Sequence, residues 1–277
     1  MAARLDVAAA HTGWMSELAW STGALGFVAG LTIAVVTAPV GVSGAMFLLP
    51  VQLSVLGVPS PAVTPTNLLF NVVATPGALL RYRRQGGLRT PLARRLVLGT
   101  LPGVVVGAVI RVFAVPGPQV FRLFVAGLLL PLGVWLCART LRPARRRPAE
   151  PPSPRAVTAL AVAVGIVGGV YGIGGGSLLG PMLVGRGLPV VQVAPAALAS
   201  TFLTSIVGAG AFALLALVAP GAVAPYWSLG LLCGLGGLVG GYVGARLQPY
   251  LPETGLRLLL GVLAALVGVL YTVQALI

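Results

Sequence analysis

Two stretches of this sequence match each other: GVSGAMFLLP at residues 41–50 and GIGGGSLLGP at residues 172–181, which align without a gap at an offset of 131 residues. Both are rich in glycine and end in proline, the two residue types that interrupt helices. Both nevertheless lie within sequence that is apolar enough to span a bilayer. Broken helices at matching places in two halves are typical of a transporter whose binding site lies near the membrane midplane.

The composition predicts an all-α membrane protein. Of the 277 residues, 57% are hydrophobic and 8% are charged, whereas a soluble domain carries about 25% charged residues. A spanning helix needs roughly 20 apolar residues, so the chain can form a polytopic helical bundle of about eight to ten transmembrane or re-entrant segments. The apolar segments 44–58 and 175–188 are too short for an untilted crossing. They are either re-entrant segments or halves of a broken crossing.

A polar, basic and proline-rich linker at residues 142–155 is the clearest boundary in the chain. It separates two halves of similar size. We therefore predict an N-terminal extramembrane segment over 1–17, a first transmembrane repeat over 18–141 and a second over 156–277. The linker itself is predicted to be cytoplasmic because of its arginines.

The similarity between the halves extends beyond the two quoted stretches. GFVAG at 26–30 resembles GIVGG at 165–169, and GVP at 57–59 resembles GLP at 187–189. A polar helix start follows in each half, with Thr64, Thr66 and Asn67 in the first and Ser200 and Thr201 in the second. This order of features predicts that each half is a copy of one structural unit.

The distribution of arginine predicts that the two copies face opposite ways. Residues 81–95 of the first half carry several arginines, whereas the matching loop 220–225 carries no charge. Conversely, Arg186, Arg246 and Arg257 fall in loops whose first-half partners are nearly neutral. Because basic loops stay in the cytoplasm, we favour inverted repeats of five segments each. Four segments per half would make the copies parallel instead.

The charged residues also exclude several classes of function. The net charge of +14 does not indicate nucleic acid, because the arginines cluster in loops beside apolar segments. The acids Asp6, Glu17, Glu150 and Glu253 and the single histidine, His11, lie outside or at the edges of those segments. Acid–base catalysis, metal binding and catalytic triads need such groups. The sequence therefore predicts neither an enzyme nor a metal or other cofactor.

Neutral donors remain inside the apolar segments. Glycine loops let backbone N–H groups approach a ligand, and a helix that begins after such a loop points its positive end at it; close helix packing is the alternative role for glycine. The side-chain amides of Asn67 and Asn71 lie four residues apart on one helical face, and a buried amide needs hydrogen-bond partners outside its own helix. This pattern suits a small oxyanion. The predicted substrate-binding residues are Gly41, Ser43, Gly44, Thr66, Asn67, Asn71, Gly174, Gly175, Gly176, Ser177, Ser200 and Thr201.

At these residues the chain resembles the sulfite exporter TauE/SafE family of membrane proteins. In both halves a glycine-rich loop precedes a leucine-rich segment with proline, a Gly-x-Pro turn and a polar-headed helix. The arginine-terminated helix GALLRYRRQGG at 77–87 also resembles the family pattern, and the likeness covers roughly residues 20–276. The resemblance implies a multi-pass transporter of the bacterial plasma (inner) membrane that moves small anions, typically sulfite or organosulfonates such as sulfoacetate.

These observations predict a secondary transporter that works by alternating access between the two halves. Nothing in the sequence resembles a P-loop for ATP. The expected partners are a small anionic substrate, the lipid bilayer and a coupling ion, either proton or sodium; a homo-oligomer is compatible with the sequence. Two alternatives remain open. One is a small-anion channel, and the other is a membrane assembly factor without transport activity.

Overall fold

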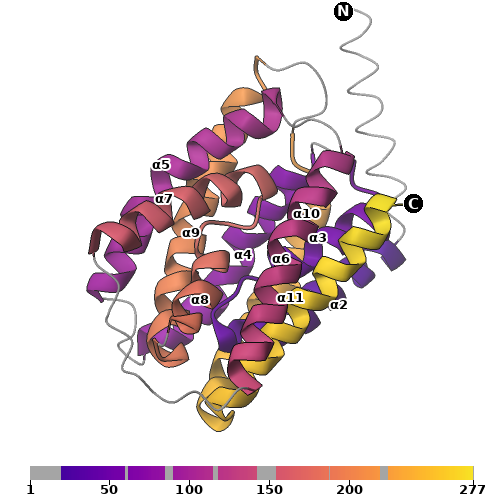
Figure 1. The fold of residues 1–277 in the computed structure, drawn as a ribbon. Coiled ribbons are helices and arrows are strands. Elements are labelled where there is room, and N and C mark those ends of the chain that lie inside the picture. Colours follow the sequence, from indigo (N-terminus) through magenta and orange to yellow (C-terminus); the bar gives the residue numbers. More distant parts are fainter. Residues whose placement is uncertain are drawn as a thin grey trace, which may run out of the picture.

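The chain folds into a bundle of helices, and the prediction of an all-α polytopic membrane protein is confirmed (Figure 1). The computed structural model describes residues 20–59, 62–84, 90–114, 118–141, 154–186, 188–218 and 224–276. Within these ranges there are ten α-helices and no strand. The predicted N-terminal segment 1–17 and all but the last two residues of the linker 142–155 lie outside them.

The two halves contain the same succession of α-helices and differ in where a 3-10 helix (η) is placed. The first half contains α2 (Trp20–Thr37), η1 (Ala38–Val40), α3 (Ala45–Ser54), α4 (Val63–Arg84), α5 (Pro91–Phe113) and α6 (Pro118–Leu141). The second half contains α7 (Pro154–Tyr171), α8 (Gly176–Gly185), α9 (Val190–Leu215), α10 (Trp227–Leu247), η2 (Gln248–Tyr250) and α11 (Glu253–Leu276). Within the described residues each half therefore has five α-helices, of which the second is short.

The short helices α3 and α8 follow the two glycine-rich loops. Each has 10 residues, which at about 1.5 Å per residue gives roughly half the thickness of the hydrocarbon core. In the described part of the chain, five longer stretches are apolar enough to cross a membrane, namely Thr22–Val40, Pro91–Phe113, Val190–Leu215, Trp227–Tyr250 and Glu253–Leu276. The segments predicted at 44–58 and 175–188 thus become short helices that begin inside the bundle.

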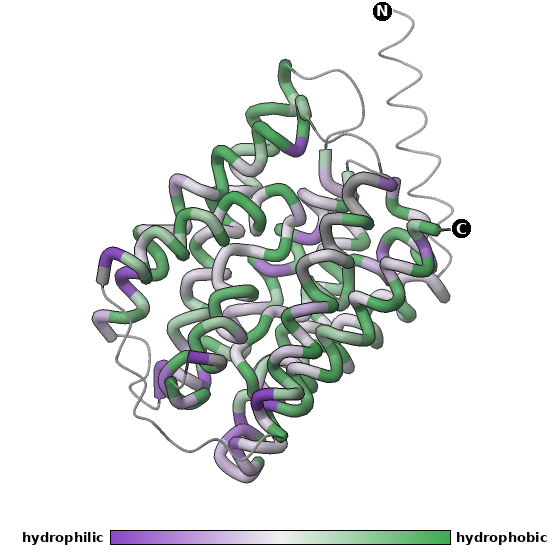
Figure 2. Tube along the Cα trace, in the orientation of Figure 1, coloured by the Kyte–Doolittle hydropathy of each residue, from purple (hydrophilic) through white to green (hydrophobic). Residues whose placement is uncertain are grey.

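Arginines collect at one end of the bundle, which we call the basic end. Here α4, α6 and α10 end and α5, α7 and α11 begin, and Figure 2 shows hydrophilic residues gathered towards helix ends. Its arginines are Arg81, Arg83, Arg84, Arg94, Arg95, Arg139, Arg155, Arg186, Arg246 and Arg257. Arg111 and Arg122 belong to the opposite end, where α5 ends and α6 begins. By the positive-inside rule this asymmetry is the one expected if the basic end faces the cytoplasm, and that orientation stays a prediction.

Packing partners are exchanged between the halves. The first helix of each half packs against the fourth helix of the other, as α2 with α10 and α7 with α5. The third helices, α4 and α9, also pack against the other half's fourth helix, and α6 packs against α11 along one edge of the bundle (Figure 1). Such reciprocal pairing is what a two-fold relationship between the halves would produce. Inverted repeats remain a prediction, which this pairing supports.

Glycines bring the paired helices into backbone contact. A Cβ atom on Gly236 or Gly240 of α10 would overlap the carbonyl oxygen of Phe27 or Leu31 in α2. In α5, a Cβ atom on Gly107 would likewise overlap the Ile166 carbonyl of α7. Small residues allow this close approach, which supplies van der Waals contact where lipid removes the hydrophobic driving force.

We expect the substitution Gly240→Ala to destabilise the α2–α10 pair, because the added methyl group has no room beside the Leu31 carbonyl. Overpacking of this kind costs about 1–3 kcal/mol, so the melting temperature of the purified protein should fall by several degrees. Gly210→Ala in α9 is the matched control, since its Cβ would meet no atom within 4 Å. Equal melting temperatures for the two variants would contradict this packing.

Candidate functional site

The first glycine loop returns the chain from the end of η1 to the start of α3. Gly41 adopts φ +75°, a left-handed conformation that favours glycine. Its Cα also lies against the backbone of Ala194 near the start of α9, where a Cβ would overlap Ala194 Cα. Residues 41–44 are buried. The loop thus lies inside the bundle and contacts the other half.

The loop meets a polar face of α4. Ser43 of the loop and Asn67 and Asn71 of α4 together form what we call the amide cluster. Ser43 Oγ donates to Asn71 Oδ1 and accepts a hydrogen bond from the Ala45 backbone N–H at 3.1 Å. Asn67 Nδ2 donates to the Ala45 carbonyl oxygen at 2.9 Å. Both asparagines are 0% exposed. The two amides therefore face the start of α3 from one side of α4.

Two polar atoms of the amide cluster are left without a hydrogen bond among the described residues. They are the donor Asn71 Nδ2 and the acceptor Asn67 Oδ1. A buried polar atom without a partner costs about 1–3 kcal/mol. An unused amide donor at the N-terminal end of a helix is a suitable ligand for an anion.

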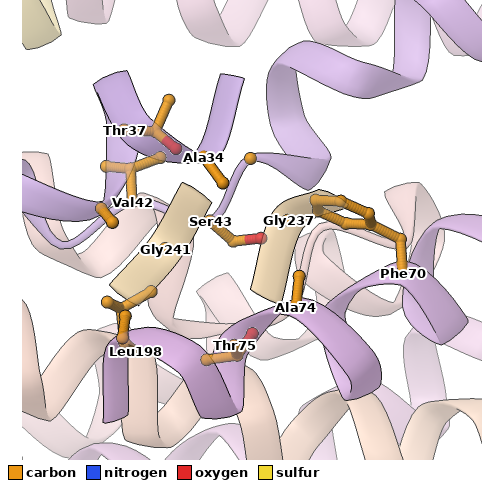
Figure 3. Close-up of a pocket in the computed structure, with 13 residues that line it drawn as sticks. Ala34, Thr37, Val42, Ser43, Phe70, Ala74, Thr75, Leu198, Gly237 and Gly241 are labelled. Carbon is orange, nitrogen blue, oxygen red and sulfur yellow. The ribbon is translucent and has the colours of Figure 1, made fainter. Parts of the chain in front are cut away.

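A small cavity adjoins the amide cluster (Figure 3). Its volume is about 20 Å³, which is room for about one water molecule. In this view Ser43 lies between the α10 backbone at Gly241 and that at Gly237, and Thr75 of α4 lies below it. Thr37, the last residue of α2, lines the cavity too. The cavity therefore extends from Ser43 towards the basic end.

The second glycine loop leads from α7 into α8 and meets a group of hydroxyls, the hydroxyl cluster: Thr100, Ser177, Ser200, Thr201, Thr204 and Ser205. All six side chains are 0% exposed. Gly174 adopts φ +72°, and a Cβ atom there would lie 2.7 Å from Thr201 Cγ2. The Gly175 N–H donates to Thr204 Oγ1 at 3.1 Å. Glycine is thus required both by conformation and by the approach of α9.

The hydroxyl cluster has further contacts at the start of α8 and between helices. Ser177 Oγ donates to the Ile173 carbonyl at 2.7 Å and lies 3.4 Å from Thr201 Oγ1. Thr100 Oγ1 and Ser200 Oγ are 2.8 Å apart. Ser205 Oγ has no partner among the described residues. The cluster therefore presents hydroxyl groups to the start of α8, much as the amide cluster presents amides to the start of α3.

The two clusters are separate but are joined through α9. Leu198 of α9 lines the cavity beside Ser43, while its neighbour Ala197 lies against Gly176. A Cβ on Gly180 of α8 would lie 3.5 Å from the Gly41 carbonyl oxygen. A displacement of α9 would therefore affect both loops.

One predicted site residue is engaged elsewhere. Thr66 Oγ1 donates to the Ala62 carbonyl at 2.8 Å and accepts from the Tyr226 N–H at 2.9 Å. This hydroxyl links the start of α4 to the chain entering α10. The other predicted residues lie in the two loops or in the clusters beside them: Gly41, Ser43, Gly44, Asn67, Asn71, Gly174, Gly175, Gly176, Ser177, Ser200 and Thr201.

The structure adds residues that sequence reasoning did not select. Thr100 of α5 packs against Gly175, with its Cβ 2.6 Å from where a Gly175 Cβ would lie. As the single hydroxyl residue in the apolar sequence of α5, it carried a weak signal. Thr37 lines the cavity, and Arg111 is a fully buried cation. Among the described residues, no group of three or more His, Cys, Asp or Glu side chains could hold a metal ion.

Comparison with known proteins assigns this arrangement to a family. The model of the family described as sulfite exporter TauE/SafE matches residues 25–271, which include both glycine loops and both clusters. Neither the curated proteins nor the solved structures contained a match to the chain. With nearly its whole length matched, the chain belongs to the sulfite exporter TauE/SafE family of membrane transport proteins.

Proposed function

We propose that the protein is a secondary transporter that moves a small sulfur-containing anion, sulfite or an organosulfonate such as sulfoacetate, across the bacterial plasma membrane. The family is the basis for the class of substrate. The observation that carries the site is the unused donor Asn71 Nδ2, buried beside the N-terminal end of α3. It supports anion binding at the first glycine loop.

The chemistry of the site suits an anion that must be released again. The first turn of α3 places the positive end of a helix dipole at the loop. Its Ala45 N–H is bonded to Ser43 Oγ and its Phe47 N–H to the Gly44 carbonyl. Ser43, Asn67 and Asn71 add neutral hydrogen-bonding groups, and the described residues that line the adjacent cavity include no charged side chain. Neutral donors bind an oxyanion more weakly than a full countercharge does. The hydroxyl cluster at the start of α8 is a second neutral site of the same kind.

Two observations support alternating access: the position of the cavity, and the packing of helices from one half against helices of the other. The cavity volume of about 20 Å³ has room for about one water molecule. An anion of one sulfur and three oxygens is larger than that. Binding therefore requires the helices around Ser43 to separate. The cavity lies on the basic side of Ser43, so we propose that the cytoplasmic path opens between α2, α4 and α10.

We expect Asn71→Leu to reduce sulfite flux at least tenfold in proteoliposomes, because a hydrogen bond to a charged group contributes about 1.5–3 kcal/mol. Initial rates of labelled sulfite uptake, measured with competition by sulfoacetate, taurine, sulfate and chloride, test this and rank the substrates. Proton and sodium gradients are applied separately to identify the coupling ion. The control is Thr272→Val, whose hydroxyl in α11 donates to the Gly268 carbonyl of its own helix.

The outcomes of this experiment separate the proposal from its alternatives. Saturable flux that Asn71→Leu abolishes and Thr272→Val preserves supports the transporter. Unitary currents without saturation would indicate a channel. If the folded wild-type protein gives no flux under any gradient and co-purifies with a stable protein partner, an assembly role replaces transport.

Alternating access also predicts a change of exposure at Thr75, which lines the cavity beside Ser43. In a protein whose Cys137 and Cys233 are replaced by serine, we expect Thr75→Cys to react with a membrane-impermeant thiol reagent added at the basic end. The reaction rate should change severalfold when saturating sulfite shifts the population of states. A rate that stays constant with and without sulfite would count against this cycle.

A further inference from the structure

Arg111 is a buried positive charge at the end of the bundle opposite the basic end. It lies in the last turn of α5 and is 0% exposed. Among the described residues it is the only buried charged side chain. A charge within a spanning helix is costly, and such residues usually face the interior of the bundle and mark the path of a substrate or ion.

The guanidinium lies where the second glycine loop begins. Arg111 Nε donates to Thr64 Oγ1 at 3.1 Å, and Thr64 Oγ1 lies 3.4 Å from the Val170 carbonyl in the last turn of α7. Tyr171, the last residue of α7, lies near Arg111. The next residue, Gly172, approaches the Thr64 carbonyl so closely that a Cβ would overlap it. Arg111 thus borders the loop that leads to the hydroxyl cluster.

A purely structural role would be to neutralise the carbonyl groups at the end of α7. The first half provides an internal comparison, because Pro39 corresponds to Val170 at the same 131-residue offset as the loops. There Gln248 Nε2 donates to the Pro39 carbonyl at 2.6 Å, and Tyr82 donates to the Ala38 carbonyl at 3.0 Å. Neutral side chains therefore suffice to bond the carbonyl groups where the chain enters the first glycine loop. The charge at Arg111 needs a further explanation.

We propose that Arg111 binds the transported anion at the non-cytoplasmic end of its path, before or after the anion occupies the neutral loops. A guanidinium offers a planar fork of donors that matches the oxygens of sulfite or a sulfonate. Thr64 acts as a positioning residue through its bond to Nε. This inference rests on the proposed function, since it assigns the charged step of the same anion path.

The test compares Arg111→Gln, which copies the neutral side chain of Gln248, with Arg111→Lys and Thr64→Val. Sulfite uptake into proteoliposomes gives KM and kcat, and melting of the detergent-solubilised protein with and without sulfite gives binding without transport. We expect Arg111→Gln to raise KM about tenfold or more and to abolish the sulfite-dependent rise in melting temperature. Arg111→Lys should restore part of both, and Thr64→Val should raise KM.

The matched control is Arg139→Gln, which removes an arginine at the basic end, where its guanidinium lies over the Trp135 ring. This variant should keep the wild-type KM. The proposal is overturned if Arg111→Gln keeps the wild-type KM and thermal shift, or if it lowers the melting temperature without sulfite while KM is unchanged. If Arg111→Gln does not fold, unchanged KM values in both Arg111→Lys and Thr64→Val overturn it.

Failure of the proposed function has a different signature. If the wild-type protein neither transports sulfite nor is stabilised by it, melting is repeated with sulfate, chloride and phosphate. Stabilisation of the wild type but not of Arg111→Gln by one of these anions would keep Arg111 as an anion site and reject sulfur anions as its ligand. If no anion stabilises the wild type, both proposals fall.

Discussion

Two helices end inside the bundle, and their backbone groups must find hydrogen-bond partners there because hydrocarbon offers none. Asn67 and Ser43 bond the Ala45 backbone at the first break, and Thr204 accepts from the Gly175 N–H at the second. These contacts hold the loops against α4 and α9. The polar residues that bond the backbone at the breaks are therefore the same residues that we propose for anion binding.

The close packing of the surrounding helices follows from the same constraint. A loop at membrane depth is tolerated only where protein covers it, and the α2–α10 and α5–α7 pairs provide that cover through glycine–carbonyl contacts. Each pair combines one helix from either half. If each tightly packed pair moves as a unit, the moving parts would therefore contain helices from both halves and would not be divided at the linker. The two glycine loops also contact helices of both halves.

The two breaks are alike in backbone and different in side-chain chemistry. The first has amides and a neighbouring Gln248, whereas the second has hydroxyls and a neighbouring Arg111. Sequence reasoning found most of these residues because the glycine loops mark the breaks and because buried amides are rare. It missed Thr100 and Thr37, since a lone threonine in an apolar helix carries no local sign of what it faces. It did not select Arg111 either, because burial cannot be inferred from a position near a helix end.

The sequence by itself determined the helical membrane class, the matching breaks, the short helices after them and the basic end. The membrane class follows from the length of the apolar segments, the breaks and short helices from glycine and proline, and the basic end from the positions of the arginines. Each of these depends on local sequence or on the bilayer, and not on contacts between distant residues. Only the tertiary structure decided which polar groups share a cluster, that Thr66 bonds towards α10 instead of the loop, and that Arg111 lies against Thr64 and the end of α7. Those contacts join residues far apart in the chain, and packing between helices selects them.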